Sequence, residues 1–161
     1  DRFGRGGHHR PFNDLGVPGI RIMEAHENYT QQHQNIREEN GIQYGDVIEH
    51  VNFGYAKKLT AVNAINLASL AWAPPAPKAV AIGGIVEASA KFKWDTVDGA
   101  IGYKIYWRDT TSPTWDHSRY VGNVTEFILE GIVIDNYFFG ISSIGANGFE
   151  SPVVFPNSVF R

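Results

Sequence analysis

The sequence predicts two structural units, a mixed helix-and-strand unit followed by an all-β sandwich. A proline cluster at residues 73–77 separates them, because proline lacks a backbone donor and favours extended geometry over helix or sheet. The stretch before this cluster, Tyr55 to Trp72, is largely apolar and contains no glycine or proline. After the cluster, short alternating apolar runs are separated by turn residues, which is typical of a β sandwich. We therefore predict domains over 1–72 and 78–161 with a linker at 73–77.

The composition excludes several classes of function. The chain has 161 residues, is 19% charged and carries a formal net charge of −3, so it lacks the basic surface that nucleic-acid-binding proteins need. No apolar run approaches the roughly 18–20 residues required to cross a bilayer. Cysteine is absent, and any metal ion must therefore be held by histidine and carboxylate groups. We expect no nucleic-acid partner and no membrane insertion.

The first unit begins with a glycine-rich loop. Residues 4–12 read Gly-Arg-Gly-Gly-His-His-Arg-Pro-Phe, and a Gly-x-Pro turn ending at Pro18 leads into an apolar segment, Gly19 to Met23, that we predict as a strand. Five of the six histidines precede the proline cluster. Any metal chemistry is therefore expected in the first unit. The unit ends in a helix over 55–72, whose apolar side chains recur at spacings of three and predict a helix docked against a core.

This loop resembles the last metal-ligand segment of the co-catalytic zinc aminopeptidases, the family that contains bacterial leucyl aminopeptidases and glutamate carboxypeptidase II. In that family the loop commonly reads Asp-His-x-Pro-Phe, and its histidine binds one of two zinc ions. The resemblance covers about the first 72 residues and implies that His9 is the metal ligand. It also implies that 1–72 is the α/β C-terminal remnant of a zinc-peptidase domain.

The other candidate site residues carry open alternatives. His8 stands where the family usually has Asp; it either contacts the developing oxyanion or is an ordinary loop histidine. Glu27, Tyr29 and His33 lie in a polar segment similar to one that runs beside the family's substrate cleft. They are either pocket residues or part of a solvated loop.

The resemblance also implies an incomplete site. A two-zinc hydrolase needs several imidazole and carboxylate ligands around ions roughly 3.5–4 Å apart. The family draws its remaining ligands and its glutamate general base from chain upstream of the final histidine. The first residue here is Asp1, without a signal-peptide pattern, so the start looks like a cut end of a longer protein. We expect this chain alone to lack most of the catalytic site and to hold no zinc tightly.

The second unit resembles a fibronectin type III domain. Runs around Trp94 and from Tyr103 to Arg108 alternate with the period of half-buried strands. The family's marks are matched at Trp94, Ile132 and Tyr137 and in a Gly-x-x-Ser-Pro ending at 148–152. No catalytic constellation is present in this half. The aromatic residues Tyr106, Trp107, Trp115 and Tyr120 are either a binding platform for carbohydrate or protein, or in part core, and alternation places Trp107 in the core.

Two functions remain as hypotheses. In the first, the chain is a fragment of a zinc-dependent, aminopeptidase-like exopeptidase that hydrolyses terminal peptide bonds of a peptide substrate through a two-zinc site, with the sandwich as an appended binding or packing domain. The family resemblance implies a secreted or periplasmic location. In the second, the chain is a non-catalytic binding or self-assembling extracellular module. In either case the first unit needs a partner, supplied by the missing peptidase portion or by self-association.

Overall fold

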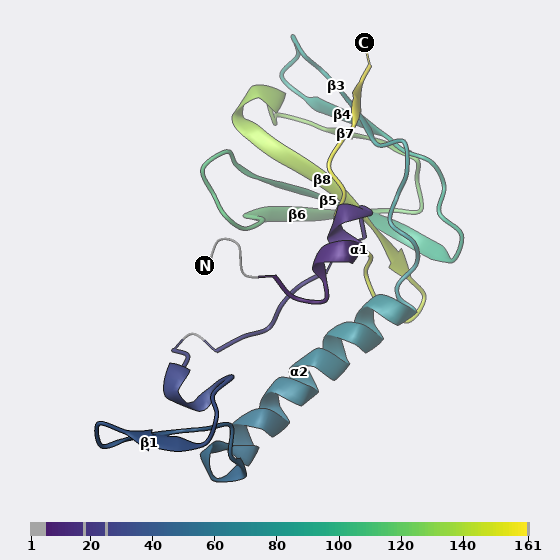
Figure 1. The fold of residues 1–161 in the computed structure, drawn as a ribbon. Coiled ribbons are helices and arrows are strands. Elements are labelled where there is room, and N and C mark those ends of the chain that lie inside the picture. Colours follow the sequence, from purple (N-terminus) through teal and green to yellow (C-terminus); the bar gives the residue numbers. More distant parts are fainter. Residues whose placement is uncertain (1–5, 18, 25, 161) are drawn as a thin grey trace. The chain divides into compact units, whose positions relative to one another are not determined.

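The computed structural model describes residues 6–17, 19–24 and 26–160. The chain divides into two compact units, Asp1–Val62 and Asn63–Arg161, and Figure 1 labels the helices and most of the strands. Gly4 and Pro18 of the predicted loop, and Asp1, lie outside the described residues.

The first unit is built from short elements. Along the chain they are the helix α1 (Arg10–Asp14), the 3-10 turn η1 (Tyr29–Gln31), the strands β1 (Arg37–Glu39) and β2 (Ile42–Tyr44), and the 3-10 turn η2 (Ile48–His50). The two strands form an antiparallel hairpin in which Glu39 pairs with Ile42. Asn40 and Gly41 close it with φ angles of 54° and 74°, as a two-residue turn with both central residues in the left-handed region requires.

The predicted strand at Gly19 to Met23 is wrong. Residues 19–24 have no regular secondary structure, and Ile20 is 72% exposed. A strand exists only when its backbone groups pair with a neighbour, and within the described residues the sheet of this unit is the β1–β2 hairpin. The described residues of the first unit therefore do not form the predicted α/β arrangement, in which helices cover a sheet.

The predicted helix at 55–72 is present as α2 (Phe53–Trp72), which begins in the first unit and ends in the second. Asn52 caps it, since its side-chain oxygen accepts a hydrogen bond of 2.9 Å from the Tyr55 amide. The helix ends just before Pro74, as expected when proline disfavours helical geometry in the residue before it. None of the residues of α2 is buried. The predicted docking of its apolar stripe is thus not seen.

The second unit is a two-sheet β sandwich (Figure 1). Its strands are β3 (Ala81–Gly83), β4 (Ala90–Lys93), β5 (Ala100–Asp109), β6 (His117–Gly122), β7 (Glu126–Leu129), β8 (Tyr137–Gly145) and β9 (Ser158–Val159), with the 3-10 turn η3 (Ile134–Asn136) before β8. One sheet has the order β7-β4-β3-β9 and the other β6-β5-β8. All neighbours are antiparallel except β3 and β9. This confirms the predicted all-β sandwich.

The core of the sandwich lies between these two sheets. Trp94 is 4% exposed and its ring lies 5.3 Å from that of Tyr103, so its predicted burial is confirmed. Ile132 and Tyr137 pack against this core while remaining partly exposed. Alternation therefore identified the inward-facing side chains of both sheets correctly.

The proline segment packs on the second unit. Pro74 and Pro77 are buried, and the Ser143 hydroxyl donates a 2.7 Å hydrogen bond to the carbonyl of Pro75. The side-chain amide of Asn147 donates to the carbonyl of Trp72 at 3.2 Å. Residues 73–77 therefore pack along the sandwich, and the stably folded unit begins at or before this segment.

Among the described residues, no helix combines the length and the apolar character needed to span a bilayer.

Candidate functional site

His9 occupies the junction between the glycine-rich loop and α1. It is the residue before the helix, and its carbonyl accepts hydrogen bonds of 3.1 Å from the amides of Phe12 and Asn13. Pro11 lies in the first turn, where a missing backbone donor costs no intrahelical hydrogen bond. The His-x-Pro-Phe sequence thus folds as the start of a short helix, which fixes the backbone at His9.

Two glycines hold the His9 side chain from either side. A Cβ added at Gly7 would stand 2.9 Å from Nδ1 of His9, and one at Gly19 would stand 3.0 Å from its Cβ. Both distances are shorter than ordinary van der Waals contact. A Cβ at Gly7 would crowd the imidazole ring, and a Cβ at Gly19 would crowd the base of the His9 side chain. Asn13 closes the loop by donating a side-chain hydrogen bond of 3.3 Å to the carbonyl of Gly19. The sequence motif therefore forms a seat for one imidazole.

The seat positions a single imidazole. A catalytic zinc ion normally has three protein ligands and an open position for water. Within the described part of the chain, no group of three histidine or carboxylate side chains could hold a metal ion together. The described residues therefore do not form a complete zinc centre by themselves.

His8 lies directly before His9 in the glycine-rich loop. It is exposed, whereas its neighbour His9 is partly buried. Its assignment as an oxyanion contact stays a prediction.

The segment with Glu27, Tyr29 and His33 is more ordered than a free loop. The Glu27 side chain is only 6% exposed and lies 3.9 Å from the guanidinium of Arg21. Tyr29 starts η1 and is 48% exposed. His33 is exposed, has a φ of 54°, and its amide donates hydrogen bonds of 2.9 and 3.1 Å to the Asp46 carboxylate. Their roles as pocket residues stay predictions.

The aromatic residues of the sandwich do not form one platform. Trp107 packs at the edge of the core and stacks on His117, with ring centroids 5.2 Å apart, which confirms its inward direction. Trp115 instead lies against the ring of Tyr106 at 5.7 Å, and Arg108 lies over Trp115 at 5.6 Å. These tilted rings pack against one another and stabilise the loop between β5 and β6.

A carboxylate links the neighbouring polar side chains on β5 and β8. Glu150 accepts hydrogen bonds from the hydroxyls of Tyr106 and, at 2.5 Å, Ser142, and its other oxygen lies 3.3 Å from Nζ of Lys104. The hydrogen bond to Tyr106 and the charge of Glu150 raise the pKa of Lys104, although burial acts to lower it. The pKa of Tyr106 is also raised, mainly because its hydroxyl is buried and secondly because it donates a hydrogen bond to Glu150. Every group has a partner, which is characteristic of a structural network.

Sequence reasoning missed the glycine seat and the buried Glu27 carboxylate. The Gly6-Gly7 pair beside His8 and His9 was a usable signal, because glycine next to a functional side chain often marks close backbone approach. Nothing in the sequence pattern indicated that Arg21 would pair with Glu27.

Over nearly its whole length, the chain is similar to fungal proteins named probable zinc metalloprotease. It is 42% identical over 161 residues to one from Pyrenophora tritici-repentis, a match that spans 97% of this chain and 37% of that protein. A protein of that name from Phaeosphaeria nodorum is 41% identical over 161 residues, with 97% and 32% covered. The chain is a homologue of these fungal proteins. It spans about a third of the length of the curated relatives it matches, and no family model matches it.

Two solved structures that the chain resembles each cover about half of it. A structure described as a myokine is 24% identical with a TM-score of 0.41, covering 50% of this chain and 89% of that one. A fibronectin type III domain of human collagen XX is 16% identical with a TM-score of 0.41, covering 52% and 92%.

Proposed function

We propose that this chain is part of a secreted, zinc-dependent exopeptidase of the co-catalytic type, in which His9 binds one of two zinc ions. The peptide substrate and the remaining ligands belong to the longer protein. The sandwich is an appended domain for binding or packing. When bound, paired zinc ions supply a water nucleophile and polarise the substrate carbonyl. His9 would hold one ion, and the seat of Gly7 and Gly19 would orient its ring.

The similarity to the fungal proteins is the observation that carries the proposal. It extends over 97% of this chain at 42% identity, so it includes the loop with His9 as well as the sandwich. The glycine seat supports the assignment, because it positions one imidazole tightly in a unit whose described residues lack the other ligands. One firmly held ligand is what a distributed metal site requires of each contributing segment.

The surface of α2 supports membership in a larger domain. Much of its surface is apolar, and Ile65, Leu67 and Leu70 are 56–73% exposed. The polar residues of the helix are Lys57, Lys58, Thr60, Asn63, Asn66 and Ser69. Exposed apolar side chains gathered on one helix mark a surface that another part of a larger structure covers. In the longer protein, the rest of the peptidase domain would cover it.

The experiment is a paired substitution in the full-length protein. His9→Ala should remove one zinc ion per molecule, measured by elemental analysis, and should lower kcat on an aminoacyl chromogenic substrate by orders of magnitude. His8→Ala serves as the matched neighbour and should retain both ions. Wild-type kcat/KM and two bound zinc ions in the His9 variant would show that the ligand assignment is wrong.

The same experiment separates the alternative of a non-catalytic module. That alternative is favoured by the exposed surface of α2, which could equally serve self-association. It requires that the full-length protein bind no stoichiometric zinc and cleave no terminal peptide bond. If neither zinc binding nor cleavage is found, the function of this chain is assembly and the peptidase proposal is rejected.

A further inference from the structure

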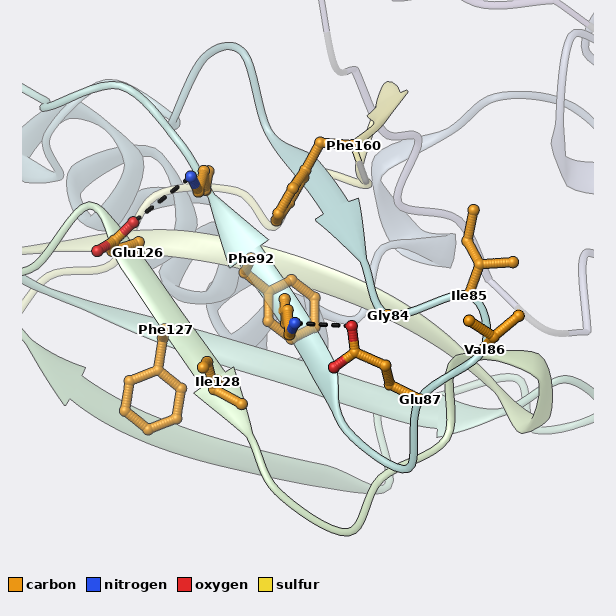
Figure 2. A pocket seen from close by; sticks show the side chains of 11 residues that line it. Gly84, Ile85, Val86, Glu87, Phe92, Glu126, Phe127, Ile128 and Phe160 are labelled. Atoms are coloured by element: carbon orange, nitrogen blue, oxygen red, sulfur yellow. Dashed lines mark hydrogen bonds and ion pairs between the residues drawn. The ribbon is translucent and has the colours of Figure 1, made fainter.

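The outer face of the β7-β4-β3-β9 sheet carries a groove of about 870 Å³. Figure 2 shows it between the Gly84–Glu87 loop on one side and the β7 residues Phe127 and Ile128 on the other, with the ring of Phe160 at one end. Pockets that bind small molecules have volumes of roughly 300–1,000 Å³. The groove is therefore large enough for one organic ligand.

Glycines at the turn after β3 build two of its walls. A Cβ at Gly83 would lie 2.9–3.0 Å from the ring of Phe160, so the ring rests directly on the backbone of β3. The Phe160 amide donates a 3.0 Å hydrogen bond to the carbonyl of Ile82, which fixes this wall to the strand. Gly84 has a φ of +101°, a conformation that only glycine adopts readily, and it directs the chain into the loop that forms the opposite wall.

The lining is apolar and open to solvent. Ile85 and Ile128 are each 52% exposed, and Val86 is 95% exposed. Three aliphatic side chains converging on one groove are unusual for surface residues, which are more often scattered singly. A ligand in the groove would remove this apolar surface from water.

The charged residues of the groove neutralise one another. Lys91 lies 2.7 Å from Glu87, and Lys93 lies 3.7 Å from Glu126; Lys93 also lies over the Phe160 ring at 5.1 Å. Both cations of the lining thus have an anionic partner in the same lining. These pairs leave no unpaired charge in the lining to attract a charged ligand, and an uncharged ligand leaves both pairs in place.

From this geometry we propose that the groove is a binding site for a small, uncharged, predominantly apolar molecule. The apolar walls provide the affinity, and the paired charges offer ionic analogues no additional attraction. The site is independent of the proposed peptidase activity, because every residue that forms it belongs to the sandwich.

The first test titrates the whole chain with N-phenyl-1-naphthylamine, an uncharged fluorescent probe, and follows backbone amide shifts by NMR. We expect saturable binding at one site with shifts centred on Val86 and Ile128. Decan-1-ol should displace the probe, and decanoate at the same concentration should displace much less. Shifts confined to the exposed surface of α2, absence of saturation, or equal competition by decanoate would overturn the proposal.

Matched variants locate the site. Ile128→Ser should weaken probe binding about fivefold, from the loss of one half-exposed aliphatic side chain. Ile101→Ser is the control, since Ile101 is 51% exposed and does not line the groove; its affinity should equal that of the wild type. If Ile128→Ser loses its cooperative urea transition, Phe160→Ala takes its place with the same expectation. Equal probe affinities for the groove and control variants would refute the site. It would also be refuted if the chain dimerised through this face and the dimer bound no probe.

Discussion

Gly7 and His9 are in such close contact that a methyl group on Gly7 would stand 2.9 Å from Nδ1 of the imidazole. The absence of a side chain at Gly7 therefore determines where the His9 ring lies. Gly6 differs, because a Cβ there would meet only the flexible side chain of Arg10, at 3.0 Å. Two adjacent glycines thus have different structural consequences.

This difference predicts the behaviour of a substitution pair in the full-length protein. Gly7→Ala should displace the His9 ring and lower zinc occupancy and kcat, because a metal ligand must be held close to its productive position. Gly6→Ala should leave both unchanged. Elemental analysis and steady-state kinetics measure the two effects, and equal zinc occupancy in the two variants would show that the seat has no role in metal binding.

For the isolated 161-residue chain, the expectation is absence of activity. One seated histidine cannot form a catalytic zinc site, so zinc should bind no more tightly than to a generic surface histidine pair. Dialysis against buffer followed by elemental analysis, and an assay with an aminoacyl chromogenic substrate, provide the measurements. Stoichiometric zinc after dialysis would be inconsistent with this expectation.

Burial predicts that alanine substitution of two tryptophans in the second unit lowers the free energy of unfolding by very different amounts. Trp94→Ala should lower the free energy of unfolding by about 3–5 kcal/mol, the range for truncating a buried aromatic side chain. Trp72 also makes an aromatic contact, 5.3 Å from Phe149, but is 63% exposed. Trp72→Ala should cost about 1 kcal/mol or less. Urea unfolding followed by circular dichroism measures both, and similar losses would mean that Trp94 is not in the core.

The packing of the proline segment predicts where the sandwich begins. Residues 73–161 should fold more stably than residues 78–161, because Pro74 and Pro77 are buried and Pro75 accepts the hydrogen bond from Ser143. Residues 1–72 alone should aggregate, since their long helix exposes apolar side chains. Sedimentation and urea melts of the three segments test this; equal stability of the two sandwich segments would restore 73–77 to the role of a simple linker.

Apolar exposure on α2 predicts that the isolated chain self-associates. Leu67→Gln removes a side chain that is 73% exposed and should shift sedimentation velocity profiles towards the monomer. Asn66→Gln changes the adjacent exposed residue without removing apolar surface and should leave the profile unchanged. A monomeric wild-type chain at high concentration would contradict this prediction.

The loop between β5 and β6 should be sensitive to acid. The Ser112 hydroxyl and the Asp109 amide donate hydrogen bonds of 2.7 and 3.0 Å to Asp116, and these bonds, the first being the larger cause, hold the pKa of Asp116 below its ordinary value of 3.8. The charged form is thus favoured in the folded state. Its contribution to stability is present above pH 3.8 and is lost as the pH falls through the lowered folded-state pKa.

Substitution at Asp116 tests this dependence. The difference in unfolding free energy between the wild type and Asp116→Asn should be largest above pH 3.8 and should shrink below it. Ser112→Ala should reduce the same pH dependence, because it removes the strongest donor. Urea unfolding at several pH values gives both profiles, and a difference that does not vary with pH would contradict the assignment.

The sequence alone determined the elements whose signals are local. Alternation placed Trp94 and Tyr103 in the core, and a stretch without glycine or proline, with apolar residues at spacings of three, predicted α2 almost to its ends. These succeed because side-chain periodicity is a property of each segment by itself. The strand predicted at Gly19 to Met23 failed because a strand needs a paired neighbour, and local pattern carries no information about whether that neighbour is present.

Only the tertiary structure decided the sites. The seat of His9 combines Gly7 with Gly19, which lies twelve positions away in the sequence, and the groove combines the turn after β3 with Ile128 and Phe160. Such contacts arise from packing between distant segments, which composition and periodicity do not encode. The exposure of α2 has the same origin. Its sequence predicts burial, but no residue of the helix is buried, because burial depends on the segments that pack against a helix and not on the helix itself.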